Sequence, residues 1–236
     1  MTYTKDTKIF KKGSTTYYFS SIFFPPEIKQ KVFALYAFVR TADNLVDCVP
    51  QDKKGFLSLR KNLDKFPILK EFPVNWTTSF LDAMQQDLTK KNYKTWKELE
   101  DYIYGSANVI GLMMAKLMGL PRESYQYAEA LGKSMQLINF VRDIQEDNDM
   151  GRRYLLKQDA LSIIKYINKY EEIDNFARQG FKYIPKKYLV PIKTASDMYR
   201  KTAEIIKKNP SVVFQKKVKP SKFTVIATAI KNYVTL

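Results

Sequence analysis

The sequence carries two copies of one acidic pattern, each with an arginine beside two aspartates spaced D-x-x-x-D. The copies comprise Arg40, Asp43 and Asp47, and Arg142, Asp143 and Asp147. Residues four apart lie on the same face of a helix, so each copy brings two carboxylates together. That arrangement disfavours a helix, because like charges at this spacing repel and Asp is a weak helix former. One such pair is typical of a solvated helix face, but two copies that each end an apolar helix favour a functional site.

The chemistry that suits this pattern is the binding of a metal ion together with a diphosphate. Carboxylate oxygens are ligands that Mg²⁺ prefers, and Mg²⁺ typically bridges a few of them to substrate phosphates. Arginine and lysine bind the remaining phosphate oxygens. The sequence has no EF-hand spacing, which argues against calcium. If the two acidic helices face each other, their four carboxylates converge. We therefore predict a Mg²⁺ site, with Mn²⁺ as the second candidate.

A site that binds Mg²⁺ and a diphosphate together suits the ionisation of an allylic diphosphate. Ionisation releases diphosphate and leaves a carbocation, while metal ions and arginine stabilise the charge on the leaving group. The carbocation needs a dry cavity lined by aromatic rings. The chain holds 15 Phe and 16 Tyr, which fits such a cavity and also fits a bulky core.

Missing residue types exclude several other reaction classes. There is no histidine, so Ser-His-Asp triads, Cys-His dyads and His-ligated zinc are excluded. The single cysteine, Cys48, cannot form an internal disulfide, which favours a reducing compartment. The N-terminal residues are too polar for a signal peptide, and no apolar run is long enough to span a membrane. We therefore expect a cytoplasmic protein.

The chain is strongly basic, with 40 Lys and Arg against 24 Asp and Glu and a net charge of +16. Such a balance is typical of high solubility, of nucleic-acid binding or of contact with an anionic membrane. No basic segment matches an RNA- or DNA-binding module. We expect no nucleic-acid partner, and the sequence indicates no obligate protein partner. Peripheral contact with an anionic membrane is a hypothesis that the charge favours.

Helical periodicity dominates the sequence, and the fold class we predict is all-α. Pro25-Pro26-Glu27 has the composition of a helix start, and apolar residues then recur at helical spacing up to Pro50. Gly119, followed by Pro121, has the composition of a helix C-cap. At 236 residues, one domain over 1–236 is expected. The expected helices cover residues 26–49, 56–66, 80–88, 96–119, 123–147, 160–166, 174–184, 191–208 and 220–233, with a loop over 67–76.

With these motifs the sequence resembles the squalene/phytoene synthase family, from about Ser14 to Ile230. The most specific likeness is the run from Gln136 to Asp147, followed by Arg152-Arg153-Tyr154-Leu155. Further similar segments are residues 14–27, 32–47, 82–88 and 102–119. The resemblance implies an isoprenoid synthase helical bundle with a central active-site cavity. It also implies head-to-head condensation of two geranylgeranyl or farnesyl diphosphates through a cyclopropyl diphosphate, giving phytoene or (dehydro)squalene plus diphosphate.

The resemblance also implies roles for individual residues. The residues implied as Mg²⁺ ligands are Asp43, Asp47, Asp143 and Asp147. They would act in catalysis together with Arg142 and Tyr154. The residues implied in substrate binding are Ser14, Tyr17, Tyr36, Arg40, Gly111, Gln136, Asn139, Tyr199 and Lys217. Of these, Tyr199 would close the site together with Tyr154.

Several of these residues also have a purely structural interpretation. Tyr17 and Tyr36 also suit a plain core, and Gly111 suits close helix packing. Ser14 suits a helix N-cap, and Tyr199 suits an anchor for the last helices.

Two positions depart from the family pattern. Asn44 stands where an aspartate is common, and Lys217 stands where an arginine is common. A lysine lacks the bidentate grip of arginine on phosphate, so substrate affinity is expected to be lower. The sequence has no Gly-rich dinucleotide fingerprint, which weighs against a requirement for NADPH.

Two other functions compete with this interpretation. A terpene cyclase or another prenyltransferase would share the helical fold, but it would carry a D-D-x-x-D or N-S-E motif, and the sequence has neither. A non-catalytic relative that acts as an assembly factor would be expected to have lost one acidic pair, and both pairs are present.

Overall fold

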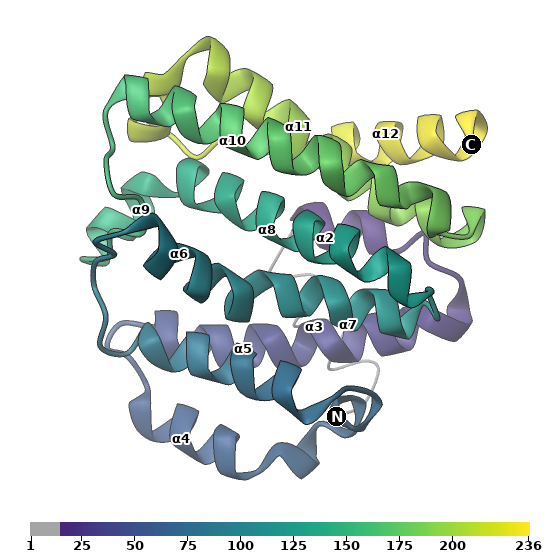
Figure 1. The fold of residues 1–236 in the computed structure, drawn as a ribbon, viewed down its shortest axis with the longest axis horizontal. Coiled ribbons are helices and arrows are strands. Elements are labelled where there is room, and N and C mark those ends of the chain that lie inside the picture. The colour runs from purple at the N-terminus through teal and green to yellow at the C-terminus, as the bar shows by residue number, and fades with distance from the viewer. Residues whose placement is uncertain (1–14) are drawn as a thin grey trace.

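The computed structural model describes the backbone of residues 15–236 and the side chains of residues 17–236. In that part of the chain the regular structure is helical, as Figure 1 shows. No β-strand occurs within it, and one isolated bridge joins Asn92 to Arg153. The predicted all-α class is therefore confirmed.

The bundle consists of α-helices together with shorter helical segments, which are 3-10 turns except for the π-helical η3. The α-helices are α2 (Thr15–Ser21), α3 (Pro26–Asp47), α4 (Lys53–Lys61), α5 (Val74–Gln86), α6 (Trp96–Ile103), α7 (Val109–Leu117), α8 (Tyr125–Arg142), α9 (Ile144–Asp149), α10 (Ala160–Arg178), α11 (Lys186–Lys208) and α12 (Lys222–Thr235). The shorter segments are η1 (Leu63–Lys65), η2 (Pro67–Glu71), η3 (Tyr104–Asn108), η4 (Arg122–Ser124), η5 (Gln179–Tyr183) and η6 (Pro210–Phe214).

Helix α3 forms one wall of the bundle. Pro26 at its first position and Glu27 in its first turn favour helix initiation. Its buried residues recur at helical spacing and include Ile28, Val32, Leu35, Phe38, Ala42 and Val46. The helix ends at Asp47, because the backbone of Cys48 is extended. Asp43 and Asp47 therefore lie in its last turns, next to the buried stripe.

The helix expected over residues 96–119 is continuous but changes its winding in the middle. α6 passes into the π-helical segment η3 and then into α7. Such π-turns locally shift the register of a helix and often occur at functional sites. Gly105 lies in this segment, and a Cβ on it would come 2.4 Å from the carbonyl oxygen of Ser79 in α5. Glycine therefore lets the two helices meet at backbone distance. Gly119 ends the run at φ +66°, as its expected role as a C-cap requires.

The helix expected over residues 123–147 is interrupted at the second acidic pattern. α8 ends at Arg142, Asp143 leaves helical geometry at φ −101° and ψ 11°, and α9 begins at Ile144. The carboxylate of Asp143 bonds to Arg142 and Lys217 and not to the helix backbone, and Asp is a weak helix former, which favours a break at this residue. Asp143 thus sits at a junction of two helices, and the prediction of one unbroken helix is wrong at this residue.

Other boundaries also differ from the prediction, and α4 covers Lys53–Lys61 where a helix over 56–66 was expected. α10 is one helix where two were expected, because Ile167 and Tyr170 continue its buried face across the expected gap. α11 begins before Pro191 and continues through it. η2 and the start of α5 occupy the expected loop over residues 67–76.

Helix α8 lies at the centre of the bundle, between α10 and α7 (Figure 1). A Cβ on Gly132 of α8 would come 2.4 Å from the carbonyl oxygen of Ala107, so α8 approaches η3 as closely as two backbones can. The short helix α2 packs against α11 and α12. Within residues 15–236, no helix is both long and apolar enough to cross a membrane.

Candidate active site

The two acidic patterns share one polar cavity of about 550 Å³, here called the polar basin. Asp43 and Asp47 reach it from α3, Asp143 from the junction after α8, and Asp147 from α9. The other charged residues of its lining are Arg40, Asp87, Arg142, Glu146, Arg152, Lys217 and Lys219. The basin therefore gathers carboxylates and cations from segments that are far apart in the sequence.

Arginines hold the carboxylates of α3 in place. Arg40 donates to Asp43 within the helix, and Arg152 donates to Asp47 and to the carbonyl oxygen of Val46. Arg152 is only 5% exposed and follows α9 in the chain, so it ties the second acidic segment to the first. Its place in the family-like segment before Tyr154 was the only sequence signal for this role.

Asp143 lies between two cations. Arg142 donates from Nε to Oδ1 of Asp143 at 2.8 Å, and Nζ of Lys217 lies 3.0 Å from the same oxygen. Lys217 also donates to Glu146. The segment after η6 thus brings Lys217 into the basin, where the family resemblance implies a basic residue.

Burial and mutual repulsion make two carboxyl groups of the basin hard to ionise. Burial, together with the charge of Asp47, raises the pKa of Asp43 to about 7. Burial, together with the charges of Asp143 and Asp47, raises the pKa of Asp147 to about 8. Burial also opposes ionisation of Asp143, but the hydrogen bonds and charge of Arg142 hold its pKa below the ordinary value. The basin therefore has more carboxylates than its own cations neutralise.

The donor set of the basin fits a hard divalent cation bound together with phosphate. No group of three or more acidic side chains among the described residues is placed to hold a metal ion unaided. Mg²⁺ does not require such a cage, because it commonly takes one or two carboxylates and completes its octahedron with water and substrate phosphates. The raised pKa values of Asp43 and Asp147 suit this arrangement, since a bound cation would favour the ionised carboxylates. The Mg²⁺ or Mn²⁺ site stays a prediction.

Asp87 links the basin to a cluster of stacked aromatic rings. It is 3% exposed and accepts hydrogen bonds from the hydroxyl groups of Tyr102 at 2.7 Å and Tyr154 at 2.8 Å. The ring of Tyr154 stacks on Phe140 with centroids 4.4 Å apart. Burial raises the pKa of Asp87 to about 6, although the two hydroxyl groups oppose that shift. Asp87 is therefore a buried residue of the basin and does not belong to the solvated surface.

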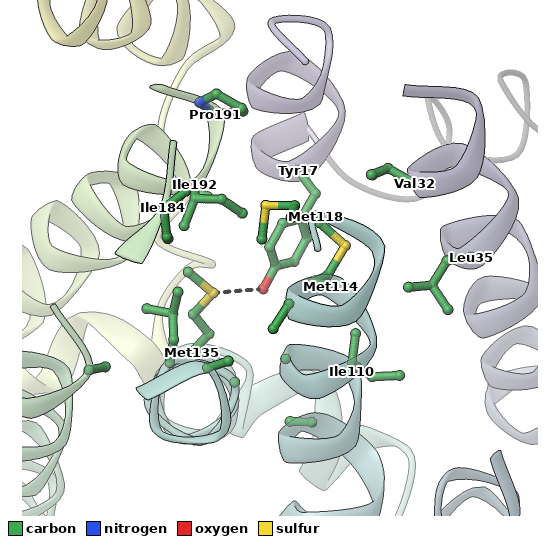
Figure 2. A pocket seen from close by; sticks show the side chains of 18 of the residues that line it. Tyr17, Val32, Leu35, Ile110, Met114, Met118, Met135, Ile184, Pro191 and Ile192 are labelled. Atoms are coloured by element: carbon green, nitrogen blue, oxygen red, sulfur yellow. Dashed lines mark hydrogen bonds between the residues drawn. The ribbon is translucent and has the colours of Figure 1, made fainter. Parts of the chain in front are cut away.

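An apolar cavity of about 260 Å³ adjoins the polar basin. Figure 2 shows its walls, which include Leu35 of α3, Met114 of α7, Met135 of α8 and Ile192 of α11. Methionine side chains adapt easily to irregular apolar ligands. The residues that line both cavities are Tyr17, Tyr36, Val39, Ser106, Gln136 and Asn139. A ligand with a charged head and an apolar tail can therefore occupy both at once.

Polar side chains mark the boundary between the two cavities. Oη of Tyr199 lies 2.9 Å from Oη of Tyr17 and 3.2 Å from Oδ1 of Asn139, so its single proton serves one acceptor at a time. Tyr17 in turn donates to Sδ of Met135 at 3.3 Å, the dashed line in Figure 2. Asn139 donates to Oε1 of Gln136 at 3.3 Å. Four of the predicted substrate-binding residues are thus brought into one network.

Three further residues were predicted to bind substrate, and the structure describes two of them. Gly111 lines the apolar cavity, and a Cβ on it would come 2.1 Å from the carbonyl oxygen of Ala128, so both of its interpretations apply. Tyr36 lines both cavities and is not plain core. Ser14 lies outside the described residues, and the prediction for it is untested.

Comparison with known proteins connects this arrangement to a family. The family model for squalene/phytoene synthase matches residues 10–162. The chain belongs to the squalene/phytoene synthase family. The matched range holds both acidic patterns, Asp87 and Tyr154.

Two members of the squalene/phytoene synthase family illustrate how similar the chain is to its relatives. The chloroplastic phytoene synthase of Daucus carota is 31% identical over 170 residues, which cover 61% of this chain and 43% of that protein. The 15-cis-phytoene synthase of Synechococcus elongatus is 23% identical over 268 residues, which cover 91% of this chain and 87% of that protein. The matched part spans less than half the length of the first chloroplastic relatives.

A solved structure agrees over almost the whole chain. A dehydrosqualene synthase in complex with a ligand superposes with a TM-score of 0.89 at 25% identity, covering 99% of this chain and 95% of that one. The squalene synthase HpnC of Alicyclobacillus acidocaldarius, at 18% identity, has a TM-score of 0.76. These similarities confirm the isoprenoid synthase fold.

Proposed function

We propose that this protein joins two allylic isoprenyl diphosphates head to head. The observation that carries the proposal is the junction of a charged basin with an apolar cavity through six shared residues. The basin suits the diphosphates, and the cavity suits a prenyl tail. The similar proteins named phytoene synthase and dehydrosqualene synthase support the same reaction.

In the basin, the carboxylates would bind the metal ion and the basic side chains would bind the phosphate oxygens of the substrate. The residues that would hold Mg²⁺ or Mn²⁺ are Asp43, Asp47, Asp143 and Asp147. Bound beside the substrate, the metal supplies neutralisation of the charge that develops on the leaving diphosphate. Arg142 and Lys217 both contact Asp143 in the basin, and they would bind phosphate oxygens beside the metal. Arg152 keeps Asp47 oriented.

The first half-reaction requires a protected carbocation. The C–O bond of one diphosphate breaks, and the diphosphate leaves with the bonding electrons. The allylic cation then bonds to the double bond of the second molecule, and loss of a proton closes a cyclopropane ring. The apolar cavity excludes water that would quench the cation. Tyr17 and Tyr36, at the boundary of the two cavities, supply aromatic faces that stabilise positive charge.

The second half-reaction uses the same site. The cyclopropylcarbinyl C–O bond breaks, a second diphosphate leaves, and the cation rearranges. Loss of a proton gives phytoene or dehydrosqualene, whereas hydride from NADPH gives squalene. Because the sequence lacks a dinucleotide fingerprint, we propose the outcome without NADPH.

The length of the cavity favours the C20 substrate. Its lining runs from Asn139 of α8 back to Ser124 at the end of η4, which is about 22 Å at 1.5 Å per residue. An extended carbon chain advances about 1.25 Å per bond, since C–C bonds are about 1.5 Å long and meet near 111°. The 16-carbon backbone of a geranylgeranyl group is then about 19 Å long and the 12-carbon backbone of farnesyl about 14 Å. We therefore propose geranylgeranyl diphosphate as substrate and phytoene as product.

Product analysis tests this proposal. Purified protein is incubated with Mg²⁺ and either geranylgeranyl or farnesyl diphosphate, with and without NADPH, and extracts are read by mass spectrometry. We expect a C40 hydrocarbon from geranylgeranyl diphosphate that NADPH does not change. A C30 product alone would overturn the chain length but keep the condensation. A C15 or C20 hydrocarbon would indicate a cyclase, and no product from folded protein would contradict the proposal.

A matched pair of variants shows whether the product comes from the basin. Asp147→Asn removes one carboxylate of the basin, whereas Asp149→Asn makes the same change at an exposed position two residues further along α9. We expect the first variant to lose the C40 product and the second to keep it.

A further inference from the structure

The last helix, α12, exposes its larger apolar residues and buries its smaller ones. Phe223, Ile230, Tyr233 and Val234 are 81%, 55%, 69% and 76% exposed. The residues that it buries are Val225, Thr228, Ala229 and Asn232. A surface helix normally turns its large apolar side chains toward the core. The outer face of α12 therefore has the composition of a contact surface.

Three of these exposed residues, together with the exposed Ala227, form one continuous line along the helix, here called the outer stripe. The outer stripe consists of Phe223, Ala227, Ile230 and Val234, which are four, three and four residues apart. That spacing keeps them on one face. Other exposed apolar residues of the described chain, such as Val49, Val74 and Leu161, come from separate elements. Single exposed residues are ordinary, whereas contiguous patches mark interaction sites, and α12 lies at the periphery of the bundle (Figure 1).

A polar network fastens α12 from its inner side. Asn232 is 2% exposed and donates to Oδ2 of Asp197 at 2.9 Å and to Oγ1 of Thr194 at 3.2 Å. Lys193 donates to Asn232 at 2.6 Å, and Lys201 donates to Thr228 at 3.1 Å. These buried contacts hold the helix in place, so the outer stripe is not needed to attach it to the bundle.

The C-terminal segment that includes α12 carries only positively charged side chains. After Glu204 the chain contains no Asp or Glu, and its lysines are Lys207, Lys208, Lys216, Lys217, Lys219, Lys222 and Lys231. Lys222 and Lys231 lie on α12 itself and are exposed. A basic helix with an apolar stripe suits anionic lipid headgroups above acyl chains. A second copy of the chain would instead bring like charges together.

We propose that the outer stripe of α12 docks the protein on an anionic membrane surface. Lys222 and Lys231 of α12 would contact lipid phosphates. Phe223 and Ile230 would enter the membrane interface. Helix α2 packs on α12 and lines the apolar cavity with Ser20 and Ser21. Docking would therefore bring α2, which is one wall of the cavity, close to the bilayer that can take up a hydrocarbon product. That last step rests on the proposed function, whereas the docking itself does not.

Binding to lipid vesicles tests the proposal with the full chain. We expect co-sedimentation with vesicles of phosphatidylglycerol and phosphatidylcholine, and at least tenfold weaker binding to phosphatidylcholine alone. The triple variant Phe223→Ser, Ile230→Ser, Val234→Ser should bind anionic vesicles at least tenfold more weakly. The matched control Val49→Ser, Val74→Ser, Leu161→Ser removes apolar side chains that are 85%, 81% and 77% exposed and should bind like the wild type.

A second pair of variants tests the charges. Lys222→Gln with Lys231→Gln should weaken binding by about fivefold for each lysine. Lys53→Gln with Lys54→Gln changes the net charge equally on α4 and should leave binding unchanged. Turnover of soluble diphosphates is measured for every variant, which separates loss of docking from loss of activity.

Three results would overturn the docking proposal. They are failure of the wild type to bind anionic vesicles, equal losses in the stripe and control variants, and a dimer in solution that the triple variant dissociates. The last result would make the outer stripe an interface between two copies of this chain.

Discussion

The polar basin and the apolar cavity are built in different ways, although six residues line both. The basin depends on ion pairs between distant segments, such as Arg152 with Asp47, which are 105 positions apart. The cavity depends on helix faces that approach closely at small residues, such as Gly111 against Ala128. Ion pairs therefore hold the basin together, and close helix packing forms the cavity. Substitutions in the basin should therefore change chemistry and pH dependence, and substitutions in the cavity should change stability and chain-length preference.

The largest effect is expected from Asp147→Asn in the basin. Turnover should fall by about 100-fold or more, the scale for loss of one electrostatic contact to a transition state. The metal-free protein should nevertheless become more stable, because burial and Asp143 raise the pKa of the lost carboxyl group to about 8. A gain of 1 kcal/mol would raise the thermal midpoint by about 2–4 °C in a chain of this size. Turnover assays and thermal unfolding at pH 8 check both effects.

Asp143→Asn is the matched comparison within the same basin. It should also reduce turnover, but it should lower the thermal midpoint, because Arg142 and Lys217 lose their shared partner. The pKa of Asp143 is already below its ordinary value, so its ionised form stabilises the fold. Equal shifts of the midpoint in the two variants would contradict this account of the charges.

The stability of the metal-free protein should fall as the pH rises. The folded-state pKa values of Asp87, Asp43 and Asp147 are about 6, 7 and 8, against an ordinary value of 3.8. Each group therefore contributes stability that is fully present below its unfolded pKa and is lost as the pH passes through its folded pKa. We expect the free energy of unfolding to fall by several kcal/mol between pH 5 and pH 8, because each group that is ionised only in the unfolded state contributes a loss of about 1.4 kcal/mol per pH unit.

Urea unfolding at several pH values measures this change. Asp147→Asn should flatten the dependence, and Mg²⁺ with inorganic diphosphate should restore stability at pH 8. Stability that rises steadily from pH 5 to pH 8 in the absence of metal would show that the three pKa values are not raised.

In the cavity, Gly111→Ala should affect stability and selectivity more than chemistry. Its Cβ would come 2.1 Å from the carbonyl oxygen of Ala128, so α7 and α8 must move apart. Overpacking costs about 1–3 kcal/mol and the better helix propensity of alanine returns up to about 1 kcal/mol. The variant should therefore lose about 1–2 kcal/mol and shift its preference toward the shorter substrate.

Gly119→Ala is the control for this change. Gly119 has φ +66° and open space around the position of a Cβ, so alanine there costs about 1 kcal/mol through backbone strain alone. Competition between C15 and C20 diphosphates should be unchanged in this variant. The same shift in selectivity in both variants would show that Gly111 does not control chain length through the cavity wall.

The smallest effect is expected from Lys217→Arg at the basin. Arginine can bind phosphate with two parallel hydrogen bonds, so KM for the diphosphate substrate should fall by about two- to fivefold with little change in kcat. Lys216→Arg makes the same exchange at the neighbouring exposed position and should leave KM unchanged. Steady-state kinetics distinguish the two, and equal effects would exclude a specific contact by Lys217.

The parts of the site that could be predicted from the sequence have local signals. Each acidic pair can be recognised from its spacing within five residues. The structure places all four carboxylates in one basin, namely those of Asp43, Asp47, Asp143 and Asp147. The all-α class follows from helical periodicity in the same way. Exact helix ends were less predictable, because the break at Asp143 goes with its contacts to Arg142 and Lys217, and the continuity of α10 goes with the burial of Tyr170.

Other parts of the site depend on contacts that only the fold creates. Arg152 binds Asp47 across 105 positions, and Tyr154 binds Asp87 across 67. The family-like segment from Arg152 to Leu155 draws attention to two of these residues, but no local pattern predicts that they bind Asp47 and Asp87. The same is true of Ser106, which lines both cavities because the π-helical segment η3 lies between α5 and α8.

A crystal structure with Mg²⁺ and a non-ionising thiolodiphosphate analogue of geranylgeranyl diphosphate would show whether the basin and the cavity form one active site. We expect the diphosphate between the carboxylates of α3 and those of Asp143 and Asp147, with the tail along α8 toward Ser124. A diphosphate bound outside the polar basin, or a tail that does not enter the apolar cavity, would contradict this expectation.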